Sequence, residues 1–203
     1  MGITERRKKE KADMTQSILD AALCLFIEQG YDNVSIRKIA EKIEYSPSTI
    51  YLYFEDKDAI FFELHNSGFT ELYKHQLEVQ NIHDPKERLL AHGRAYLNFA
   101  FEHQEYYDIM FIVRSPGKFI DKYKNWECGD RAYNLLIQNV KECIEAGYFR
   151  DQKPEGVAFL LWSAMHGMAS LLIRKRLTLP ISDNGDVMDI FNHSLQVLTA
   201  FIK

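Results

Sequence analysis

Apolar positions in the segment 34–43 recur at the spacing of a helix that buries one face. Ser35 directly precedes this stripe and can cap the helix, because its hydroxyl can accept a hydrogen bond from a free backbone N–H in the first turn. The stripe ends near Glu44-Tyr45, where we expect a tight turn. Its members, at i, i+3, i+4 and i+7, are Ile36, Ile39, Ala40 and Ile43.

A second short helix is predicted to begin at Ser46-Pro47. Serine is a good N-cap, and proline at the first helical position gives up an N–H that would have no partner there. Ile50 and Phe54 are expected to pack inward from this helix. The remaining side chains are left for its outer face, namely Ser48, Thr49, Tyr51, Leu52 and Tyr53. The pattern therefore predicts a pair of helices joined by a tight turn.

The outer face of the second helix carries hydroxyls and apolar edges but no charge. Such groups suit base edges, thymine methyls and phosphates in a major groove. The same pattern also fits a helical hairpin that serves as plain scaffold, with a solvated polar face. The residues alone leave both interpretations open.

The rest of the chain also shows helical spacing, interrupted by Gly, Pro and capping residues. Gly30, Asp84-Pro85, the turn Ser115-Pro116-Gly117, Gly147 and the loop from Leu179-Pro180 to Asn184-Gly185 are the main breaks. We expect an all-α fold of about nine helices, with a three-helix domain at residues 1–56 and a helical domain at 57–203. Helices are predicted over 14–29, 57–80, 85–102, 103–113, 118–146, 154–173 and 186–202.

Composition supports a globular helical protein and excludes several classes of function. The chain has 203 residues, 46% of them hydrophobic, and only five prolines and ten glycines. Its net charge of −4 argues against non-specific coating of nucleic acid, so any DNA contact has to come from a local patch. Three scattered cysteines are too few for a disulfide framework or a zinc site and suit a reducing cytoplasm. No apolar run follows the basic start, so no signal peptide is predicted.

Four segments carry a resemblance to a known family: Gly30-Tyr31, residues 35–40, residues 46–54 and residues 56–60. They resemble the DNA-binding domain of the TetR family of transcriptional repressors, from about Met14 to Phe62 without a gap. Two positions depart, because the family usually has Gly at the position of Glu44 and a small aliphatic residue at that of Tyr45. If the turn needs a positive φ, Glu44 adds a penalty of roughly 1 kcal/mol.

The resemblance and the outer face together identify candidate DNA contacts. Lys57, at the start of the fourth helix, is interpreted as a phosphate contact, with an exposed surface charge as the alternative. The charged segment 4–13 is interpreted as a basic arm near DNA or, alternatively, as a frayed terminus. The predicted DNA-binding residues are Arg37, Ser46, Ser48, Thr49, Tyr51, Leu52, Tyr53 and Lys57.

Residues 156–173 contain no charged side chain, and this length of 18 residues is the lower limit of a membrane-span signal. Polar groups within it favour a helix buried by core and partner instead, and no membrane contact is predicted. Ser163, Gly167 and Ser170 form a stripe of small residues that lets another helix approach closely. The segment from Trp162 to Gly167 resembles the Trp-x-x-x-His-Gly signature of one C-terminal subclass of the family. In the family the last two long helices pair with those of a second subunit, which implies a homodimer on a double-stranded operator.

No catalytic constellation, metal site or cofactor motif is predicted. The seven histidines show no metal spacing along the chain, and there is no phosphate-binding Gly loop, nucleophile elbow or Cys–His pair. The resemblance instead implies a regulator that an unidentified small molecule releases from DNA. The alternatives are a constitutive DNA-binding adaptor with a solid core, or an all-α enzyme. Candidate pocket residues are Phe99, Tyr106, Tyr107, Met110, Phe111, Trp126, Tyr133, Trp162, Met165, His166 and Met168.

Overall fold

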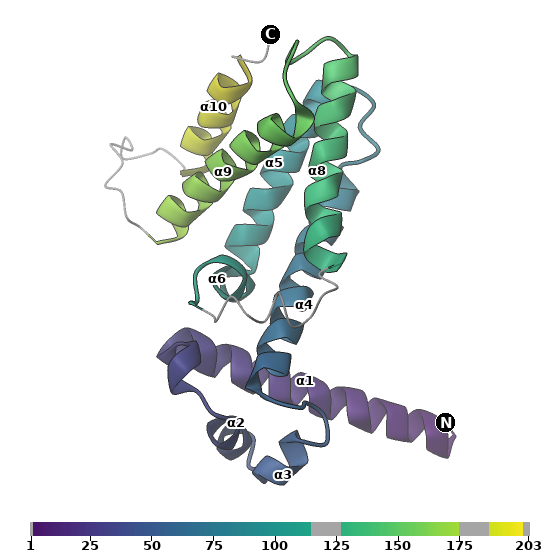
Figure 1. Ribbon diagram of the computed structural model, residues 1–203, viewed down its shortest axis with the longest axis vertical. Helices are drawn as coiled ribbons and strands as arrows, with labels where there is room; N and C mark the ends of the chain where they lie inside the picture. Colours follow the sequence, from purple (N-terminus) through teal and green to yellow (C-terminus); the bar gives the residue numbers. More distant parts are fainter. Residues whose placement is uncertain (1, 115–126, 175–186, 201–203) are drawn as a thin grey trace. The chain divides into compact units, whose positions relative to one another are not determined.

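The computed structural model describes residues 2–114, 127–174 and 187–200, and all regular structure within them is helical. This confirms the predicted all-α fold (Figure 1). The Ser115-Pro116-Gly117 turn, the start of the helix predicted from Lys118, Trp126 and the 179–185 loop lie outside the described residues. The elements are α1 (Ile3–Gln29), η1 (Tyr31–Asn33), α2 (Ile36–Lys42), α3 (Pro47–Ile50), α4 (Lys57–Glu78), α5 (Pro85–Glu102), α6 (Gln104–Phe111), α8 (Glu127–Glu145), α9 (Pro154–Ile173) and α10 (Val187–Ala200).

Helix starts follow the predicted capping residues. The Ser35 hydroxyl accepts from the Lys38 N–H at 3.3 Å, which starts α2. Asp56 Oδ1 accepts from the Ala59 N–H at 2.7 Å at the start of α4. Asp84 caps α5 in the same way, ahead of a proline at the first helical position. Each cap satisfies a backbone N–H that the helix cannot, so these predicted boundaries are confirmed.

The chain forms two compact units. The first contains residues 1–69 and 105–126, and the second contains residues 70–104 and 127–203. Helix α4 is continuous, with its first part in one unit and its last turns in the other. The functional boundary predicted between residues 56 and 57 stays a prediction.

The first unit is built around apolar side chains from α1, α2, α3 and α4. Phe26, Tyr31 and Phe61 form its aromatic centre, with ring centroids 5.1–5.6 Å apart. Ile39 and Ile50 of the two short helices are fully buried against it. The two helices of the hairpin are therefore held by α1 and α4 rather than by their own short backbone ladders.

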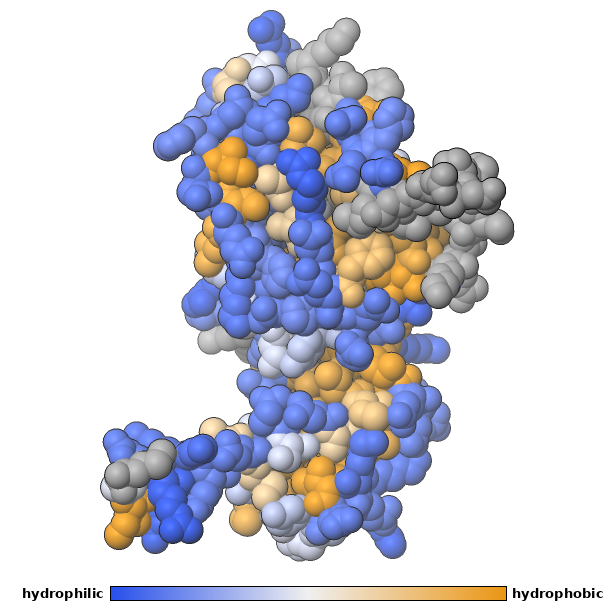
Figure 2. Space-filling model, turned by 180° about the vertical axis from the view of Figure 1, so that it is seen from behind, coloured by the Kyte–Doolittle hydropathy of each residue, from blue (hydrophilic) through white to orange (hydrophobic). Residues whose placement is uncertain are grey.

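The first helix is longer than the predicted 14–29, because α1 already begins at Ile3 and includes the charged segment 4–13. Nothing in the segment breaks a helix, and Arg, Lys, Glu and Ala are good helix formers. An ion pair between Arg6 and Glu10, one turn apart, adds local support at 2.8 Å. The side chains are exposed, and Figure 2 shows mostly hydrophilic residues over the N-terminal turns of α1, with a hydrophobic patch at the end.

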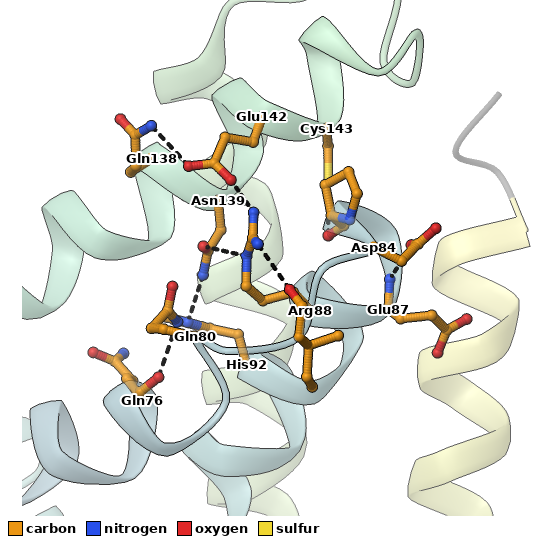
Figure 3. Close-up of polar contacts among 12 residues, drawn as sticks. Gln76, Gln80, Asp84, Glu87, Arg88, His92, Gln138, Asn139, Glu142 and Cys143 are labelled. Atoms are coloured by element: carbon orange, nitrogen blue, oxygen red, sulfur yellow. Dashed lines mark hydrogen bonds and ion pairs between the residues drawn. The ribbon is translucent and has the colours of Figure 1, made fainter.

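The second unit is organised around α5, which contacts α8, α9 and α10. Its core includes a buried polar network between α5 and α8 (Figure 3). Arg88 donates to Asn139 Oδ1 at 3.2 Å, to the Ile82 carbonyl at 2.8 Å and to the Glu142 carboxylate. Because Asn139 Oδ1 accepts from Arg88, its Nδ2 donates to His92 Nδ1 at 3.0 Å. The arginine thus orients the amide, and the amide keeps His92 Nδ1 unprotonated.

Helix α9 is apolar along its length but buried on only one side within this chain. It is the one helix among the described residues long and apolar enough to cross a membrane, and 28% of its apolar window is buried. A core helix of a soluble protein meets the same criterion. Phe159 and Leu160 are 60% and 62% exposed within this chain, so the predicted burial of this face by a partner stays a prediction.

Candidate nucleic-acid interface

The turn between α2 and α3 is closed by two backbone hydrogen bonds. The Tyr45 N–H donates to the Ala40 carbonyl at 2.9 Å, and the Glu44 N–H donates to the Glu41 carbonyl at 3.2 Å. This is the Schellman arrangement, in which the residue after the C-cap adopts a left-handed conformation. Glu44 does so, with a φ of 60°. The turn therefore has the positive φ on which the conformational penalty depends, and a glutamate rather than a glycine adopts it.

Helix α3 begins as predicted but ends earlier than the hairpin pattern suggests. The Ser46 hydroxyl accepts from the Thr49 N–H at 3.3 Å, and Pro47 is the first helical residue. After Ile50 the chain tightens into turns, with the Leu52 and Tyr53 N–H groups bonded three residues back. The tighter winding turns Phe54 toward the core, against which it packs.

The exposed surface of this segment is aromatic and apolar at its centre. Tyr51 and Leu52 are 57% and 78% exposed, and Tyr45 in the preceding turn is 50% exposed. Ser46 and Ser48 are exposed beside them. Tyr53 differs from the prediction, because it is half-buried and packs against the core. Thr49 is also half-buried, and its hydroxyl lies 3.1 Å from that of Ser46.

The two predicted basic contacts are placed differently. Arg37 on α2 is exposed and paired with Glu41 at 2.9 Å, a weak surface ion pair that can be exchanged for a phosphate. Lys57 is half-buried, and its ammonium donates to the carbonyls of Tyr31 and Val34 at 2.8 and 2.9 Å. Two of its three N–H groups are thus used within the protein, and its phosphate contact stays a prediction.

Tyr31 joins the start of α4 to the corner after α1. Its ring lies 4.0 Å below the Lys57 ammonium, and its hydroxyl donates to the Asp58 carboxylate. Burial, and then the hydrogen bond to Asp58, raise the pKa of Tyr31, so it remains a donor. These contacts fix the first turn of α4 on the helices that carry the exposed face.

Comparison with known families identifies this arrangement. The family model for bacterial regulatory proteins of the tetR family matches residues 18–64, which include α2, the turn and α3. A second model, for a tetracyclin repressor-like C-terminal domain, matches residues 89–198, more than half of the chain. The chain belongs to the TetR family. It is a DNA-binding transcriptional regulator with a helix-turn-helix motif, and α2, the Schellman turn and α3 are that motif.

Several transcriptional regulators of the helix-turn-helix type resemble the chain over half of its length or more. The transcriptional regulator AcrR of Shigella flexneri is 26% identical over 151 residues, covering 71% of this chain and 70% of the relative. The biofilm regulator IcaR of Staphylococcus aureus is 26% identical over 108 residues, covering 52% and 57%. Relatives of this kind are regulators and not enzymes. The Trp-x-x-x-His-Gly subclass stays a prediction.

Solved structures share the fold at lower identity. FadR of Bacillus subtilis, solved with stearoyl-CoA, matches with a TM-score of 0.74 and 19% identity, over 90% of this chain and 96% of that one. PfmR of Thermus thermophilus matches with a TM-score of 0.67 and 21% identity, over 89% and 96%. At these identities the likeness establishes the TetR fold and nothing finer.

The predicted pocket residues are divided between the two units. The second unit contains Phe99, Tyr133, Trp162, Met165, His166 and Met168. Four of the remaining candidates lie on α6 in the first unit, and Trp126 lies outside the described residues. The α6 candidates are Tyr106, Tyr107, Met110 and Phe111.

One subset does come together in the second unit. The Trp162 ring lies 6.1 Å from that of Tyr133 and 6.0 Å from that of His166. His166 Nδ1 is 3.2 Å from the hydroxyl of Tyr96, a residue that is not among the predicted pocket candidates. Burial lowers the pKa of His166, so the ring is neutral near pH 7. The available signal for Tyr96 was its position three residues before Phe99 on one face of α5.

Proposed function

We propose that the protein is a homodimeric repressor whose α3 segment reads operator DNA and whose second unit binds a small-molecule effector that releases it. The observation that supports this proposal is the exposed group Tyr45, Tyr51 and Leu52. These side chains lie on a motif whose core is already filled by its own buried side chains. Large apolar side chains at the surface of a small rigid motif indicate a contact surface. Tyr and Leu there suit thymine methyls and base edges, and the neighbouring serines suit phosphates.

Helix α9 supports the homodimer. Leu160, Ser163, Gly167 and Leu171 follow one another at spacings of three and four residues, and so share one helical face. A Cβ added at Gly167 would have nothing within 4 Å, and Leu171 is 42% exposed. Val197 of α10 adds a further exposed apolar side chain. A long uncharged face with small residues suits close packing against the same face of a second copy.

The effector site is proposed at Tyr96, Tyr133, Trp162 and His166. These side chains combine aromatic surface with one neutral histidine and two tyrosine hydroxyls, which suits an apolar molecule with a polar end. The FadR structure with stearoyl-CoA makes long-chain acyl thioesters the first compounds to test. A regulator of this kind works beside the chromosome, so we place it in the cytoplasm.

A gel-shift experiment tests the reader. The full-length protein is titrated against DNA from upstream of its own gene, with unrelated DNA as competitor and at one stated salt concentration, because phosphate contacts are salt-dependent. Tyr51→Ala and Leu52→Ala are expected to weaken specific binding by about 1–3 kcal/mol each. Leu77→Ala, on an exposed leucine of α4, is the matched control and should leave affinity unchanged.

Two outcomes would count against the proposal. Sequence-independent binding by the folded dimer would reject operator recognition by the α3 segment, whichever variant is used. If specific binding is found but no acyl thioester or other apolar compound weakens it, the effector part fails and a constitutive DNA-binding adaptor is favoured.

A further inference from the structure

A group of nitrogen and carboxylate donors lies in the second unit and shares no residue with the aromatic subset described above. Glu71 and His75 are one turn apart on α4, and His103 is the C-cap of α5. One donor atom from each of these three residues lies within 4.8 Å of the other two. The histidines are on different helices, so no spacing along the chain reveals the group.

The His75 ring is already oriented for ligation. Its Nδ1 lies 3.1 Å from the backbone carbonyl of Glu71, an acceptor, so this nitrogen carries the proton. The other nitrogen, Nε2, lies 3.2 Å from a carboxylate oxygen of Glu102, the last residue of α5. Metal-ligating histidines usually donate the N–H of their other ring nitrogen to a carbonyl or a carboxylate. His75 Nδ1–H does this, so Nε2 is the nitrogen that would bind the ion after losing its proton, with the Glu102 carboxylate as a neighbouring donor.

The other donors are oriented by neighbours as well. Lys74 holds one carboxylate oxygen of Glu71 at 2.7 Å, and the second oxygen lies 3.9 Å from His103 Nε2. The fully buried ring of Phe99 lies 6.0 Å from the His75 ring and 5.7 Å from the His103 ring. An apolar support of this kind fixes the rings and limits water on one side.

We propose that Glu71, His75 and His103 bind a divalent first-row transition metal ion, best fitted by Zn²⁺, with Glu102 or water as the fourth ligand. Two imidazoles and a carboxylate are a donor set that zinc accepts, and no thiolate belongs to the group. Tetrahedral ligands at about 2.1 Å from zinc lie about 3.4 Å apart. Donor atoms that are up to 4.8 Å apart therefore have to approach one another by roughly an ångström when the ion binds. The ion ties the last turns of α4 to the end of α5. This inference does not depend on the proposed function.

Titration of the untagged full-length protein with ZnCl₂, followed by calorimetry, tests the site. We expect one ion per chain and a rise in melting temperature with added Zn²⁺. His75→Ala and His103→Ala should weaken binding by about tenfold or more. His83→Ala replaces an exposed histidine outside the group and should bind as the wild type does.

A second variant separates loss of a ligand from loss of the fold, and a second metal ion reports which atoms bind it. Glu71→Gln keeps the size of the side chain and removes its charge, so it should lose affinity while circular dichroism shows a folded protein. Co²⁺ gives a visible absorption spectrum that reports its ligands, and nitrogen and oxygen ligation without a thiolate charge-transfer band is expected. Absence of binding, unchanged affinity in both histidine variants, or a thiolate band would each overturn the assignment.

Discussion

At the scale of the residue, Glu44 illustrates how a backbone motif can hold a side chain against its conformational preference. It occupies the left-handed position of the Schellman turn between α2 and α3. The end of α8 has the same two hydrogen bonds, from Gly147 to the Ile144 carbonyl and from Tyr148 to the Cys143 carbonyl. There the left-handed position is held by glycine, with a φ of 96°. The ends of α2 and α8 thus share the motif, at α8 with the residue it favours and at α2 without it.

Glu44→Gly is therefore expected to stabilise the protein. Removing the Cβ relieves a left-handed strain of about 1–2 kcal/mol, and the extra flexibility of unfolded glycine returns part of it. We expect a net gain of about 0.5–1 kcal/mol in the free energy of unfolding, measured by urea denaturation. Glu44→Ala keeps the Cβ and should give no gain.

Gly147→Ala provides the converse control, because it introduces a Cβ at the matched position of α8. A loss of about 1 kcal/mol is expected there. Equal stability of wild type and Glu44→Gly would mean that the turn in solution does not hold Glu44 in the left-handed region.

Lys57 allows a second test at this scale, between a structural and a DNA-binding role. Lys57→Met keeps the apolar stem and removes the ammonium that donates to the Tyr31 and Val34 carbonyls. We expect the free energy of unfolding to fall by about 1–2 kcal/mol, because charged donors to buried carbonyls contribute about that much. Lys141→Met, at an exposed position on α8, should change stability little. Unchanged stability together with weaker operator binding would instead show that Lys57 acts on phosphate.

At the scale of the element, capping residues were sufficient to predict where helices begin, whereas the charge of the segment 4–13 did not indicate that the segment is helical. The caps at Ser35, Ser46 and Asp84 involve residues only three apart, so the sequence predicts them directly. The segment 4–13 was interpreted as an arm because it is charged, yet charge does not prevent a helix whose residues favour one. The inward packing of Ile50 and Phe54 is as predicted, but α3 ends at Ile50 and the next residues form turns bonded three residues back, which the apolar spacing does not distinguish from a continued helix.

Helix α9 gives the prediction that belongs to this scale. Leu160→Asp places a charge on its exposed apolar face, where a second copy is proposed to pack. A buried charge without a partner is costly, so the dimer should dissociate about 100-fold more readily, as measured by sedimentation equilibrium. Asn134→Asp adds the same charge at an exposed position of α8 and should leave the association constant as it was. A wild-type protein that sediments as a monomer would remove the proposed interface altogether.

At the scale of the whole molecule, the important polar contacts join positions far apart in the chain. Arg88 meets Asn139 across 51 residues, and Tyr96 meets His166 across 70. Helical periodicity predicts which face of a helix is buried, but not which helix covers it. This is why the all-α fold and the helix-turn-helix could be predicted, whereas the pocket candidates divided between two units. The His75 and His103 group was missed for the same reason.

Two buried histidines, one in each unit, make stability depend on pH. Burial lowers the pKa of His92 to about 4, and burial of His65 outweighs its bond to the Met110 backbone and lowers its pKa to about 4 as well. Both have an ordinary value of 6.5 in the unfolded chain. Between these values the unfolded chain binds protons that the folded chain does not. The free energy of unfolding therefore falls as the pH falls from about 6.5 to about 4, by about 2–3 kcal/mol for each histidine.

Urea midpoints measured across this pH range test the prediction, and His92→Asn separates the two sites. Asparagine puts Oδ1 where Nδ1 accepts from Asn139, so the network with Arg88 is kept while the titrating group is lost. The variant should show roughly half of the acid-dependent loss that the wild type shows.

His75 acts in the opposite direction. Burial lowers its pKa, but the Glu71 carbonyl and the Glu102 carboxylate raise the pKa by more, so the net shift is upward. Its stabilisation is present in acid and is lost as the pH rises. A wild-type midpoint that stays constant or rises on acidification would mean that His65 and His92 are accessible to protons in the folded protein, and that the two cores open more readily than their burial implies.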